Sequence, residues 1–594
     1  MRPVAIRLSA LALLGAAWLQ AQPQRLMSWP VRGTREMVAA ANNLEAEAGF
    51  RMLAMGGNAV DAGVAATLAA AVTEQARFGL GGEMPLLIKM AGKPVVVVDG
   101  VGIAPEKATP EFFRARSPER WEQPDRMPPI PANGLHAAIT PGVLDGLLLA
   151  LEHHGAFSFE KVATPAAEYA AGFPLMEEFA GFIRMNQKIL ELWPTSKSFF
   201  LPNGAPPRAG DLFRATDLAN TLQELIRAER KARGNRARKI RAVRDYFYQG
   251  PIAKKIADFN AANNGLIALE DLKRQRASFD DPRFGDFHGY QVVKPGFWTQ
   301  GPVMIQALNI LEGYDLRAMG HNSPQYLHTV IEAVKLAFAD RDRYYGDPKF
   351  SKIPEVTLLS KEYGAERRKL IDPGKASMEH RPGSFAPPLN LSNGPAAAGA
   401  VDQDTTCVNV IDRWGNAFSA TPSGAWLPSV IVGDTGIPLS TRLQSFVLTT
   451  GHANLLAPGK RPRVTLSPTL VLKDGKPFMA MSTPGGDNQD QAMLQVLLNI
   501  IVFGMSAQEA VEAPRFQTEH FYTSFASHEF TPGRVALESR MPASASAELA
   551  RKGHLIDMRG DWSNASAPTV ILVRPDTVLD GGADPRRGRY IMAR

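Results

Sequence analysis

Two adjacent threonines, Thr405 and Thr406, stand where an unpatterned stretch of chain meets a strand-like segment. Pro-Gly, Pro-Pro and Gly-Pro pairs interrupt residues 372–404, and no helical or strand period runs through them, so we expect a mobile linker there. Residues 407–421 then show the pattern of a β-hairpin around a polar turn. A flexible segment that runs into a threonine and a strand is the arrangement that an N-terminal nucleophile needs.

An N-terminal threonine carries its own base. Its hydroxyl first attacks the carbonyl of the preceding residue, here Asp404, and water then cleaves the resulting ester. The freed α-amine has a pKa of about 8 and can take the proton of the Thr405 hydroxyl, so no histidine is required. Taken alone, however, the threonine pair favours a simpler interpretation, two β-branched residues that open a strand.

The elements that must position these threonines are both helical and extended. Helices are expected over residues 44–55, 58–73, 143–154, 217–227, 252–262, 324–343 and 491–503. Strands are expected over residues 94–99, 407–411, 417–421, 469–472, 478–482 and 569–573. The pattern predicts an α/β protein whose middle is mainly helical and whose chain becomes β-rich after Thr405.

The first 21 residues have the pattern of a secretory signal peptide. Arg2 and Arg7 precede an apolar run from Leu8 to Leu19, and the small residue Ala21 suits a cleavage point. The alternatives are a membrane anchor and a chance apolar start, but the run is short for a bilayer span and no later run reaches about 18 apolar residues. We expect a protein that begins near residue 22 after processing, is periplasmic or secreted, and has no stable membrane span.

The composition is typical of a globular protein and does not suggest a disordered or fibrous one. The chain has 594 residues, of which 45% are hydrophobic and 21% charged, which suits a large globular core. Its one cysteine, Cys407, allows no intrachain disulfide and is expected to be a buried small apolar residue, not a nucleophile. No His/Cys/Asp cluster has the spacing of metal ligands, so neither a metal nor another cofactor is expected.

One segment accounts for much of the net charge of +7. Residues 227–244 contain nine Lys or Arg and one acidic residue, Glu229. This run is typical of the solvated face of a helical insertion, and the alternative is an anionic partner. No aromatic residues interleave the run to stack bases, so no nucleic-acid partner is expected.

Many short motifs follow one another in a single order. Before Thr405 they are AGFRMLAMGGNAVDAG (48–63), APEKA (104–108), TPG (140–142) and AFADRDRYYGDP (337–348). From there on they are DTT (404–406), DRWGNA (412–417), KRP (460–462), LSPT (466–469), PGG (484–486), APR (513–515) and GADPR (582–586). With these motifs the chain closely resembles the γ-glutamyltransferase family along nearly all of its length after the signal peptide.

The resemblance implies a fold and a division of the chain. The family fold is a four-layer αββα sandwich of the N-terminal-nucleophile hydrolases, built from two subunits that arise by self-cleavage. Here the large subunit would comprise residues 22–404 and the small catalytic subunit residues 405–594, and the two would pair as a heterodimer. The cleavage site would lie between Asp404 and Thr405.

The resemblance also assigns catalytic roles. Thr405 corresponds to the nucleophile, and Ser423 falls where the family has a second threonine hydroxyl. Gly485 and Gly486 match the pair whose backbone N–H groups form the oxyanion hole, although without the resemblance they read as an ordinary turn.

The substrate pocket departs from the family pattern. The family uses an arginine and two serines for the α-carboxylate of glutamate, and three polar or acidic groups for its α-amine. By alignment these positions hold Val101, Val464, Thr465, Ala425, Arg442 and Ser445. Because Arg442 would repel an ammonium group, it suggests an acyl group that ends in a carboxylate; the alternative is a solvated or salt-bridged surface arginine.

Two further groups of residues have open interpretations. Asp487 could bind substrate or cap the helix that follows, and capping is the preferred interpretation for Asp490. Trp298 and Trp426 could line the acyl pocket, but core packing is expected for both. The candidate substrate-binding residues are therefore Arg442, Ser445, Thr465 and Asp487.

Together these observations predict an amidohydrolase that cleaves itself before Thr405 and acts through an acyl-threonine ester. Its partner is a small amide or peptide, and water or an amine accepts the acyl group. A genuine γ-glutamyl hydrolase or transferase acting on glutathione-like substrates is one alternative. A non-catalytic exported binding protein that retains the fold is another.

Overall fold

The computed structural model describes residues 26–118, 122, 127–385, 389, 391 and 405–594. The predicted signal peptide, Asp404 and most of the second half of the predicted linker lie outside the described residues. Within the described first half of that linker, residues 372–385 form no helix or strand beyond an isolated bridge between Asp372 and Lys375.

Two antiparallel sheets of seven strands form the centre of the molecule. The first sheet has the order β1 (Val31–Gly33), β18 (Leu579–Ala583), β17 (Thr569–Val573), β13 (Lys476–Ser482), β12 (Thr469–Lys473), β9 (Tyr290–Lys294) and β8 (Arg283–Phe287). The second sheet has the order β19 (Tyr590–Ala593), β2 (Met37–Ala40), β10 (Val408–Ile411), β11 (Ala417–Ala420), β3 (Met84–Lys89), β4 (Val95–Gly100) and β7 (Ser278–Asp280). Each sheet combines strands from both sides of Thr405, so the two predicted subunits would share both sheets.

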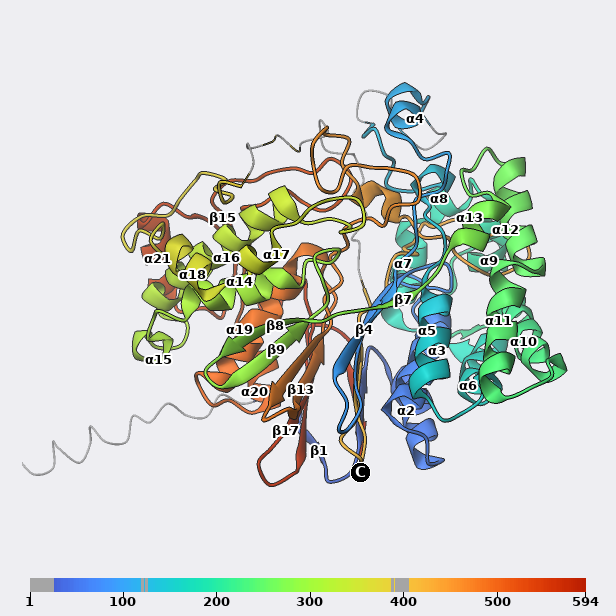
Figure 1. Cartoon of the computed structure of the whole chain (residues 1–594), viewed down its shortest axis with the longest axis horizontal. Helices are drawn as coiled ribbons and strands as arrows, with labels where there is room; N and C mark the ends of the chain where they lie inside the picture. Colours follow the sequence, from blue (N-terminus) through green and yellow to red (C-terminus); the bar gives the residue numbers. More distant parts are fainter. Residues whose placement is uncertain (1–25, 119–121, 123–126, 386–388, 390, 392–404) are drawn as a thin grey trace, which may run out of the picture.

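Helices cover the outer face of each sheet, and Figure 1 shows the resulting four layers. The layer on the second sheet contains α2 (Asn43–Ala54), α3 (Ala59–Thr73), α5 (Val143–His154), α6 (Phe159–Ala171), α7 (Glu177–Met185), α10 (Thr216–Lys231), α11 (Arg236–Tyr248) and α12 (Pro251–Ala262). The layer on the first sheet contains α14 (Pro302–Leu311), α16 (Pro324–Tyr344), α18 (Lys361–Arg368), α19 (Gln489–Ile501), α20 (Ala507–Glu512) and α21 (Ala543–Arg551). The expected αββα sandwich is confirmed, and the long predicted helices and strands match observed elements within a few residues.

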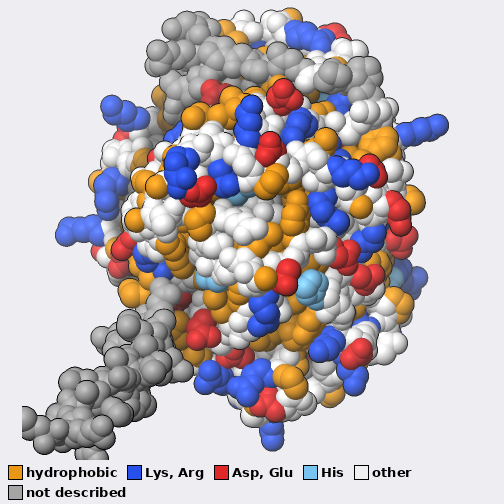
Figure 2. All heavy atoms as spheres, turned by 90° about the vertical axis from the view of Figure 1, so that its left-hand side faces the viewer, with side chains coloured by type: hydrophobic (Ala, Val, Ile, Leu, Met, Phe, Trp, Pro, Cys, Tyr) orange, Lys and Arg blue, Asp and Glu red, His pale blue; other side chains and the backbone are white. Residues whose placement is uncertain are grey.

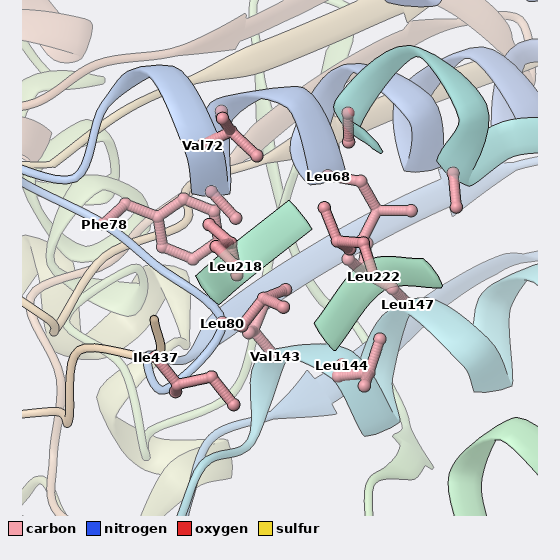
Figure 3. Packing of buried hydrophobic residues seen from close by; sticks show 14 of the residues in the cluster. Leu68, Val72, Phe78, Leu80, Val143, Leu144, Leu147, Leu218, Leu222 and Ile437 are labelled. Atoms are coloured by element: carbon pink, nitrogen blue, oxygen red, sulfur yellow. The ribbon is translucent and has the colours of Figure 1, made fainter. Parts of the chain in front are cut away.

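Helix α3 is buried on every side because it lies between the second sheet and the outer helices. All fifteen of its residues, from Ala59 to Thr73, are buried. Figure 3 shows Leu68 of this helix beside Leu147 of α5 and Leu222 of α10. A helix that is apolar all round needs this kind of central position.

The β10–β11 hairpin and helix α3 are joined through one carboxylate. Asp412 accepts hydrogen bonds from the backbone N–H groups of Trp414 and Asn416 within the turn, each at 2.9 Å. Its second oxygen accepts from the N–H of Ala59 at the start of α3 (2.8 Å). The hairpin that follows Thr405 is thereby fixed to the helix that covers it.

The basic segment 227–244 forms the end of α10 and most of α11, with a short loop between them. Its basic side chains include Arg230, which pairs with Glu160 (2.5 Å), and Arg244, which pairs with Asp145 (2.5 Å). This arrangement supports the interpretation as the solvated face of a helical insertion. On another face, formed around α16, α18 and α21, Lys and Arg are interspersed with Asp and Glu (Figure 2).

Among the described residues, the search for a membrane span finds no helix that is both long enough and apolar enough.

Gly63 tests the packing between α3 and the second sheet. A Cβ at this position would lie 2.4 Å from the ring of Phe418 in β11, whereas a Cβ at Gly181 in α7 would meet nothing within 4 Å. Gly63→Ala should lower the free energy of unfolding by about 1–3 kcal/mol through overpacking. The control Gly181→Ala should be neutral or stabilise by about 0.5–1 kcal/mol, because alanine favours a helix over glycine. Urea denaturation of both variants measures the difference, and equal effects would contradict the close packing.

Candidate active site

Thr405 lies at the start of the hairpin, paired with the segment that leaves β11. It forms an antiparallel bridge with Ser423, and the N–H of Thr406 donates to the carbonyl of Pro422 (3.0 Å). The hydroxyls of Thr405 and Ser423 are 3.1 Å apart, and Thr405 is only 2% exposed. The structure therefore brings the two predicted hydroxyl residues into direct contact.

Two further side chains approach these hydroxyls. Trp426 Nε1 donates to Ser423 Oγ at 3.2 Å, and Gln489 Nε2 lies 3.5 Å from Thr405 Oγ1. Trp426 is buried, as expected for core packing, and its indole N–H also contacts the site. Trp298 is buried, and its indole N–H donates to Asp280 (2.8 Å). Gln489 belongs to the polar run that follows Gly486, but only Asp487 of that run was among the candidate binding residues.

Gly485 and Gly486 form a tight turn between β13 and α19. Both have positive φ angles, +115° and +54°, which glycine adopts without strain. A Cβ at Gly485 would lie 2.3 Å from Ser566 Oγ, so a side chain is excluded there. Within the described part of the chain, neither N–H donates to another group. Successive free N–H groups in a turn can bind an oxyanion.

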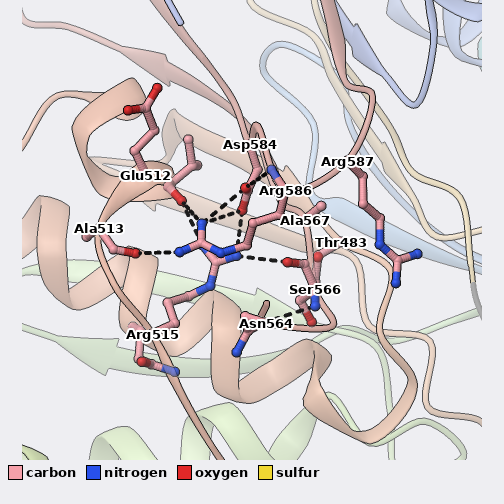
Figure 4. A network of polar contacts seen from close by, with 12 residues as sticks. Thr483, Glu512, Ala513, Arg515, Asn564, Ser566, Ala567, Asp584, Arg586 and Arg587 are labelled. Carbon is pink, nitrogen blue, oxygen red and sulfur yellow. Dashed lines mark hydrogen bonds and ion pairs between the residues drawn. The ribbon is translucent and has the colours of Figure 1, made fainter. Parts of the chain in front are cut away.

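A network of buried polar groups holds one side of this glycine turn (Figure 4). Asn488 Nδ2 donates to Asn564 Oδ1 (2.7 Å) and to Ser566 Oγ (3.0 Å). Arg515 Nη2 donates to the carbonyl of Ser566 (2.8 Å) and to Asp584 (2.5 Å). Two of the sequence motifs, APR and GADPR, thus contribute residues that support the turn.

Asn409 connects the two sheets next to the site. Its Nδ2 donates to Ser482 Oγ in β13 and to Thr569 Oγ1 in β17, both at 2.9 Å, and its Oδ1 accepts from Ser419 Oγ in β11 (2.7 Å). Ser482 is the last residue of β13 and lies just before the glycine turn. This network therefore fixes the strand that follows Thr405 relative to the turn.

Arg442 is completely buried beside the site, so the interpretation as a surface arginine is wrong. Its Nε donates to Glu83 at 2.5 Å, so the interpretation as a salt-bridged residue is partly correct. Its guanidinium stacks on the ring of Trp426, with Cζ 4.3 Å from the ring centroid. Its Nη1 and Nη2 have no hydrogen-bond partner among the described residues. Burial lowers the pKa of Arg442, and Glu83 opposes this effect.

The other candidate binding residues are also buried. Asp487 forms an ion pair with Arg341 and accepts from the N–H of Ser524 (2.9 Å), so its charge is already compensated. Ser445 has a buried hydroxyl without a partner in the described structure. Thr465 is also buried.

Neither aspartate of this region caps the helix. The N-cap residue of α19 is Asn488, which makes no side-chain capping bond. Asp490 instead forms a buried ion pair with Lys294 (2.9 Å) and accepts from Ser467 Oγ (2.8 Å). The preferred capping interpretation for Asp490 is wrong because a lysine of the neighbouring strand β9 reaches it.

Cys407 is buried, with its sulfur 3.6 Å from Thr569 Oγ1. Burial raises the pKa of the thiol, which keeps it protonated. This environment suits the expected apolar role.

One group of side chains has the proximity of metal ligands, a cluster that sequence spacing did not reveal. His328 and Glu332 of α16 and His554 have ligand atoms within 4.8 Å of one another. However, Glu332 pairs with Lys335 (2.5 Å) and Arg381 (3.1 Å). A cation would have to compete with these two charges, so we interpret the group as an internal hydrogen-bonded cluster.

An αββα sandwich with a threonine at the start of a hairpin in one sheet, and a glycine turn after a strand of the other sheet, has the arrangement of the N-terminal-nucleophile hydrolases. A family model described as gamma-glutamyltranspeptidase matches residues 46–593. The chain is 32% identical to the glutathione hydrolase proenzyme of Escherichia coli (strain K12), over 94% of this chain and 91% of that protein. It is 34% identical to the acylase ACY 1 proenzyme of Pseudomonas sp. (strain SE83), over 93% of this chain and 92% of that protein.

A solved structure agrees with these relatives. The cephalosporin acylase from Bacillus halodurans matches with a TM-score of 0.82 and 28% identity, covering 97% of this chain and 98% of that chain. The chain therefore belongs to the gamma-glutamyltranspeptidase family and is an acyl-transferring amidohydrolase.

The histidine cluster makes the fold sensitive to acid. His328 Nε2 donates to the carbonyl of Asp372 (2.8 Å), so its Nδ1 accepts from His554 Nε2 (2.9 Å). Burial, with Lys335, His328, His520 and Lys552 nearby, lowers the pKa of His554 to about 2. Above pH 6.5 the imidazole of His554 is neutral in both the folded and the unfolded protein. Below it only the unfolded state gains the proton, so stability falls by about 1.4 kcal/mol per pH unit for one histidine.

Thermal unfolding between pH 7 and pH 5 measures this effect. His554→Gln retains a donor to His328 but cannot titrate. As the pH is lowered from 7 to 5, the unfolding midpoint of this variant should therefore fall less than that of the wild type. The control is His153→Gln, at a half-exposed position, which should keep the wild-type slope. Equal slopes for His554→Gln and the wild type would contradict the assignment.

Proposed function

We propose that the chain cleaves itself between Asp404 and Thr405 and then hydrolyses amides through an ester on the Thr405 hydroxyl. The observation that carries this proposal is the 3.1 Å contact between Thr405 Oγ1 and Ser423 Oγ at the start of a strand. Asp404 itself lies outside the described residues. The proposed division into residues 22–404 and 405–594 follows from this cleavage point.

In self-cleavage, the Thr405 hydroxyl attacks the carbonyl carbon of Asp404. The peptide C–N bond breaks as the ester C–O bond forms, and the nitrogen becomes the α-amine of Thr405. Water then hydrolyses the ester and releases the Asp404 carboxylate. Because both sheets contain hydrogen-bonded strands from both products, the two subunits are expected to remain together as a heterodimer.

In turnover, the α-amine of Thr405 takes the proton of its own hydroxyl. The hydroxyl oxygen attacks the substrate carbonyl, and the N–H groups of Gly485 and Gly486 bind the developing oxyanion. One such donor contributes roughly 3 kcal/mol to transition-state stabilisation. The substrate C–N bond then breaks, the amine leaves with the proton, and water hydrolyses the acyl ester. Ser423 orients the Thr405 hydroxyl throughout.

The acyl pocket supports a substrate without a free α-amine. Val101 and Val464 are fully buried apolar residues at positions where the family resemblance implies polar contacts to the glutamate carboxylate. Arg442 presents two buried Nη groups that have no partner in the described structure. An ammonium group there would be repelled, whereas a carboxylate or carbonyl oxygen would satisfy the guanidinium. We therefore propose an acyl group with a terminal oxygen acceptor, for which glutaryl amides are a suitable probe.

The export proposal rests on the sequence of residues 1–21. A large subunit that is recovered from the periplasm or culture medium and begins close to residue 22 would support it. Recovery of full-length protein only from the cytoplasm would contradict it.

A matched pair of variants tests self-cleavage. Thr405→Val and Thr406→Val each remove one hydroxyl with little change in volume, and both positions are buried. Thr405→Val should give one full-length band on a denaturing gel, because no nucleophile remains. Thr406→Val should give the two bands of the wild type, since the Thr406 hydroxyl has no partner in the described structure. Two bands from Thr405→Val would exclude the proposed cleavage.

Acyl specificity is tested with anilides of glutaric, butyric and γ-linked glutamic acid. Wild type should have a kcat/KM for the glutaryl anilide that exceeds the other two by at least about tenfold, equivalent to 1.4 kcal/mol. The double variant Glu83→Gln/Arg442→Met removes both buried charges together, so that neither is left uncompensated. It should lose activity on the glutaryl anilide while butyryl hydrolysis changes less than about threefold. Faster hydrolysis of the γ-glutamyl anilide by wild type would favour the glutathione-hydrolase alternative, and no hydrolysis of a wider panel would favour a non-catalytic protein.

A further inference from the structure

The two glycines of the turn have no side chains to restrict their backbone, so contacts from other residues must set the direction of their N–H groups. One such contact comes from Gln300, which precedes helix α14 and is completely buried. Gln300 Nε2 donates to the carbonyl of Gly486 at 3.2 Å. Gln300 Oε1 accepts from Arg341 Nη1, also at 3.2 Å. The amide therefore connects an arginine to the peptide that follows the second glycine.

Arg341 is itself held in one orientation. Its Nε and Nη2 donate to Asp342 Oδ1 at 2.9 and 2.7 Å, and Nη2 also donates to the carbonyl of Tyr522 (2.7 Å). Its Nη1 donates to Gln300 and to Asp487. All five N–H groups of the guanidinium thus have an acceptor, and the planar fork cannot rotate without losing several bonds at once.

The surroundings of Arg341 add to this rigidity. Its guanidinium lies over the ring of Phe338, at 4.4 Å from the centroid, and Phe338 stacks on Phe521. Asp342, which receives two of its bonds, also accepts from the N–H of Tyr522 (2.8 Å). Neighbouring cations, chiefly Arg341, hold the pKa of the Asp342 carboxyl down at about 2. The ion pair therefore persists over the whole working range of pH.

Gln300 and Arg341 precede Thr405 in the chain, whereas Gly486 and Asp487 follow it. The Asn564–Ser566 network, which binds Asn488 just after the turn, comes entirely from residues after Thr405 (Figure 4). The glycine turn is thus held between one group from each predicted subunit.

We propose that Gln300, oriented by Arg341, is a positioning residue that sets the oxyanion-binding N–H groups of Gly485 and Gly486 from the large subunit. This inference rests on the proposed role of the glycine pair. Among the described residues, Gln300 makes no hydrogen bond to Thr405; it acts by fixing the carbonyl of Gly486 and with it the adjoining peptide planes. A misplacement of about 1 Å in such a group can cost about 10²-fold in rate.

The chain provides a matched control at Gln306, which lies on α14. Gln306 is 2% exposed and also joins two side chains, because its Nε2 donates to Asp340 (3.0 Å) and its Oε1 accepts from the hydroxyl of Tyr345. It makes no hydrogen bond to the glycine turn. Gln300→Met and Gln306→Met therefore remove similar buried amides of similar volume, and only the first removes a contact to Gly486.

The experiment compares self-cleavage, anilide turnover and labelling of Thr405 by an aryl sulfonyl fluoride. In labelling, Thr405 Oγ1 forms a bond to sulfur, fluoride leaves, and the α-amine takes the proton. A sulfonyl oxygen then occupies the oxyanion site. Intact mass measures the rate without a known substrate, and thermal midpoints compare the stability of the two variants.

Gln300→Met should slow labelling and lower kcat by about 10–100-fold, with KM changed less than about threefold, whereas Gln306→Met should lose stability only. If Gln300→Met does not self-cleave while Gln306→Met does, at similar thermal midpoints, the positioning role is also supported. Labelling and kcat within about twofold of the Gln306→Met values would overturn it. If wild type is neither labelled at Thr405 nor cleaved, the proposed function fails instead, so the two failures are distinguishable.

A second substitution separates position from charge. Arg341→Lys keeps the positive charge beside Asp342 and Asp487 but cannot make all five directional bonds. It should slow labelling to an extent similar to Gln300→Met. Wild-type labelling by Arg341→Lys, in a protein with an unchanged thermal midpoint, would show that Gln300 needs no arginine to orient it.

Discussion

The amide of Asn409 joins the two sheets between the proposed nucleophile, Thr405, and the glycine turn. A purely apolar interface between sheets is non-directional and would allow one sheet to shift against the other. Asn409 instead bonds to Ser419 in its own sheet and to Ser482 and Thr569 in the other. One of these partners, Ser482, lies just before the glycine turn, and Asn409 lies in β10, shortly after Thr405. The relative position of the proposed nucleophile and the proposed oxyanion site therefore depends on this buried network, whose loss would leave several polar groups without partners.

The buried charges around the site likewise fix the arrangement of the groups that they join. Arg341, Arg442 and Arg515 are each fully buried, and each is paired with a carboxylate. Such pairs contribute little net stability, because desolvation offsets much of the attraction, but their directional bonds specify one arrangement of the groups they join. Arg341 contacts Gln300 and Asp487 next to the glycine turn, and Arg515 contacts the carbonyl of Ser566. Arg442 differs because Glu83 satisfies only its Nε, and its two Nη groups have no partner among the described residues.

Much of the fold follows from local patterns in the sequence. Helix α3 could be predicted because its small apolar residues repeat between an asparagine cap and a polar end, and the hairpin after Thr405 because its strands flank a polar turn. The role of Thr405 depended on the resemblance, since a threonine pair before a strand has no chemical signature by itself. The turn at Gly485 was recognisable for the same reason.

Contacts between distant segments could not be predicted in this way. Asp490 has the position of a helix cap, yet Lys294, nearly two hundred residues earlier, determines its role. Trp426 and Gln489 are ordinary residue types whose contacts with Ser423 and Thr405 exist only after the sheets have packed. The histidine cluster draws His328 and His554 from distant segments, so no spacing rule could have found it.

The central claim is that Thr405 becomes an N-terminal nucleophile that carries the acyl group. The most direct measurement is mass spectrometry of the two subunits, with wild-type enzyme incubated with a glutaryl anilide and quenched in acid. The account predicts that the small subunit gains the mass of one glutaryl group and that fragmentation locates it on an N-terminal Thr405. An acyl group on any other residue, or a small subunit that begins elsewhere, would contradict it.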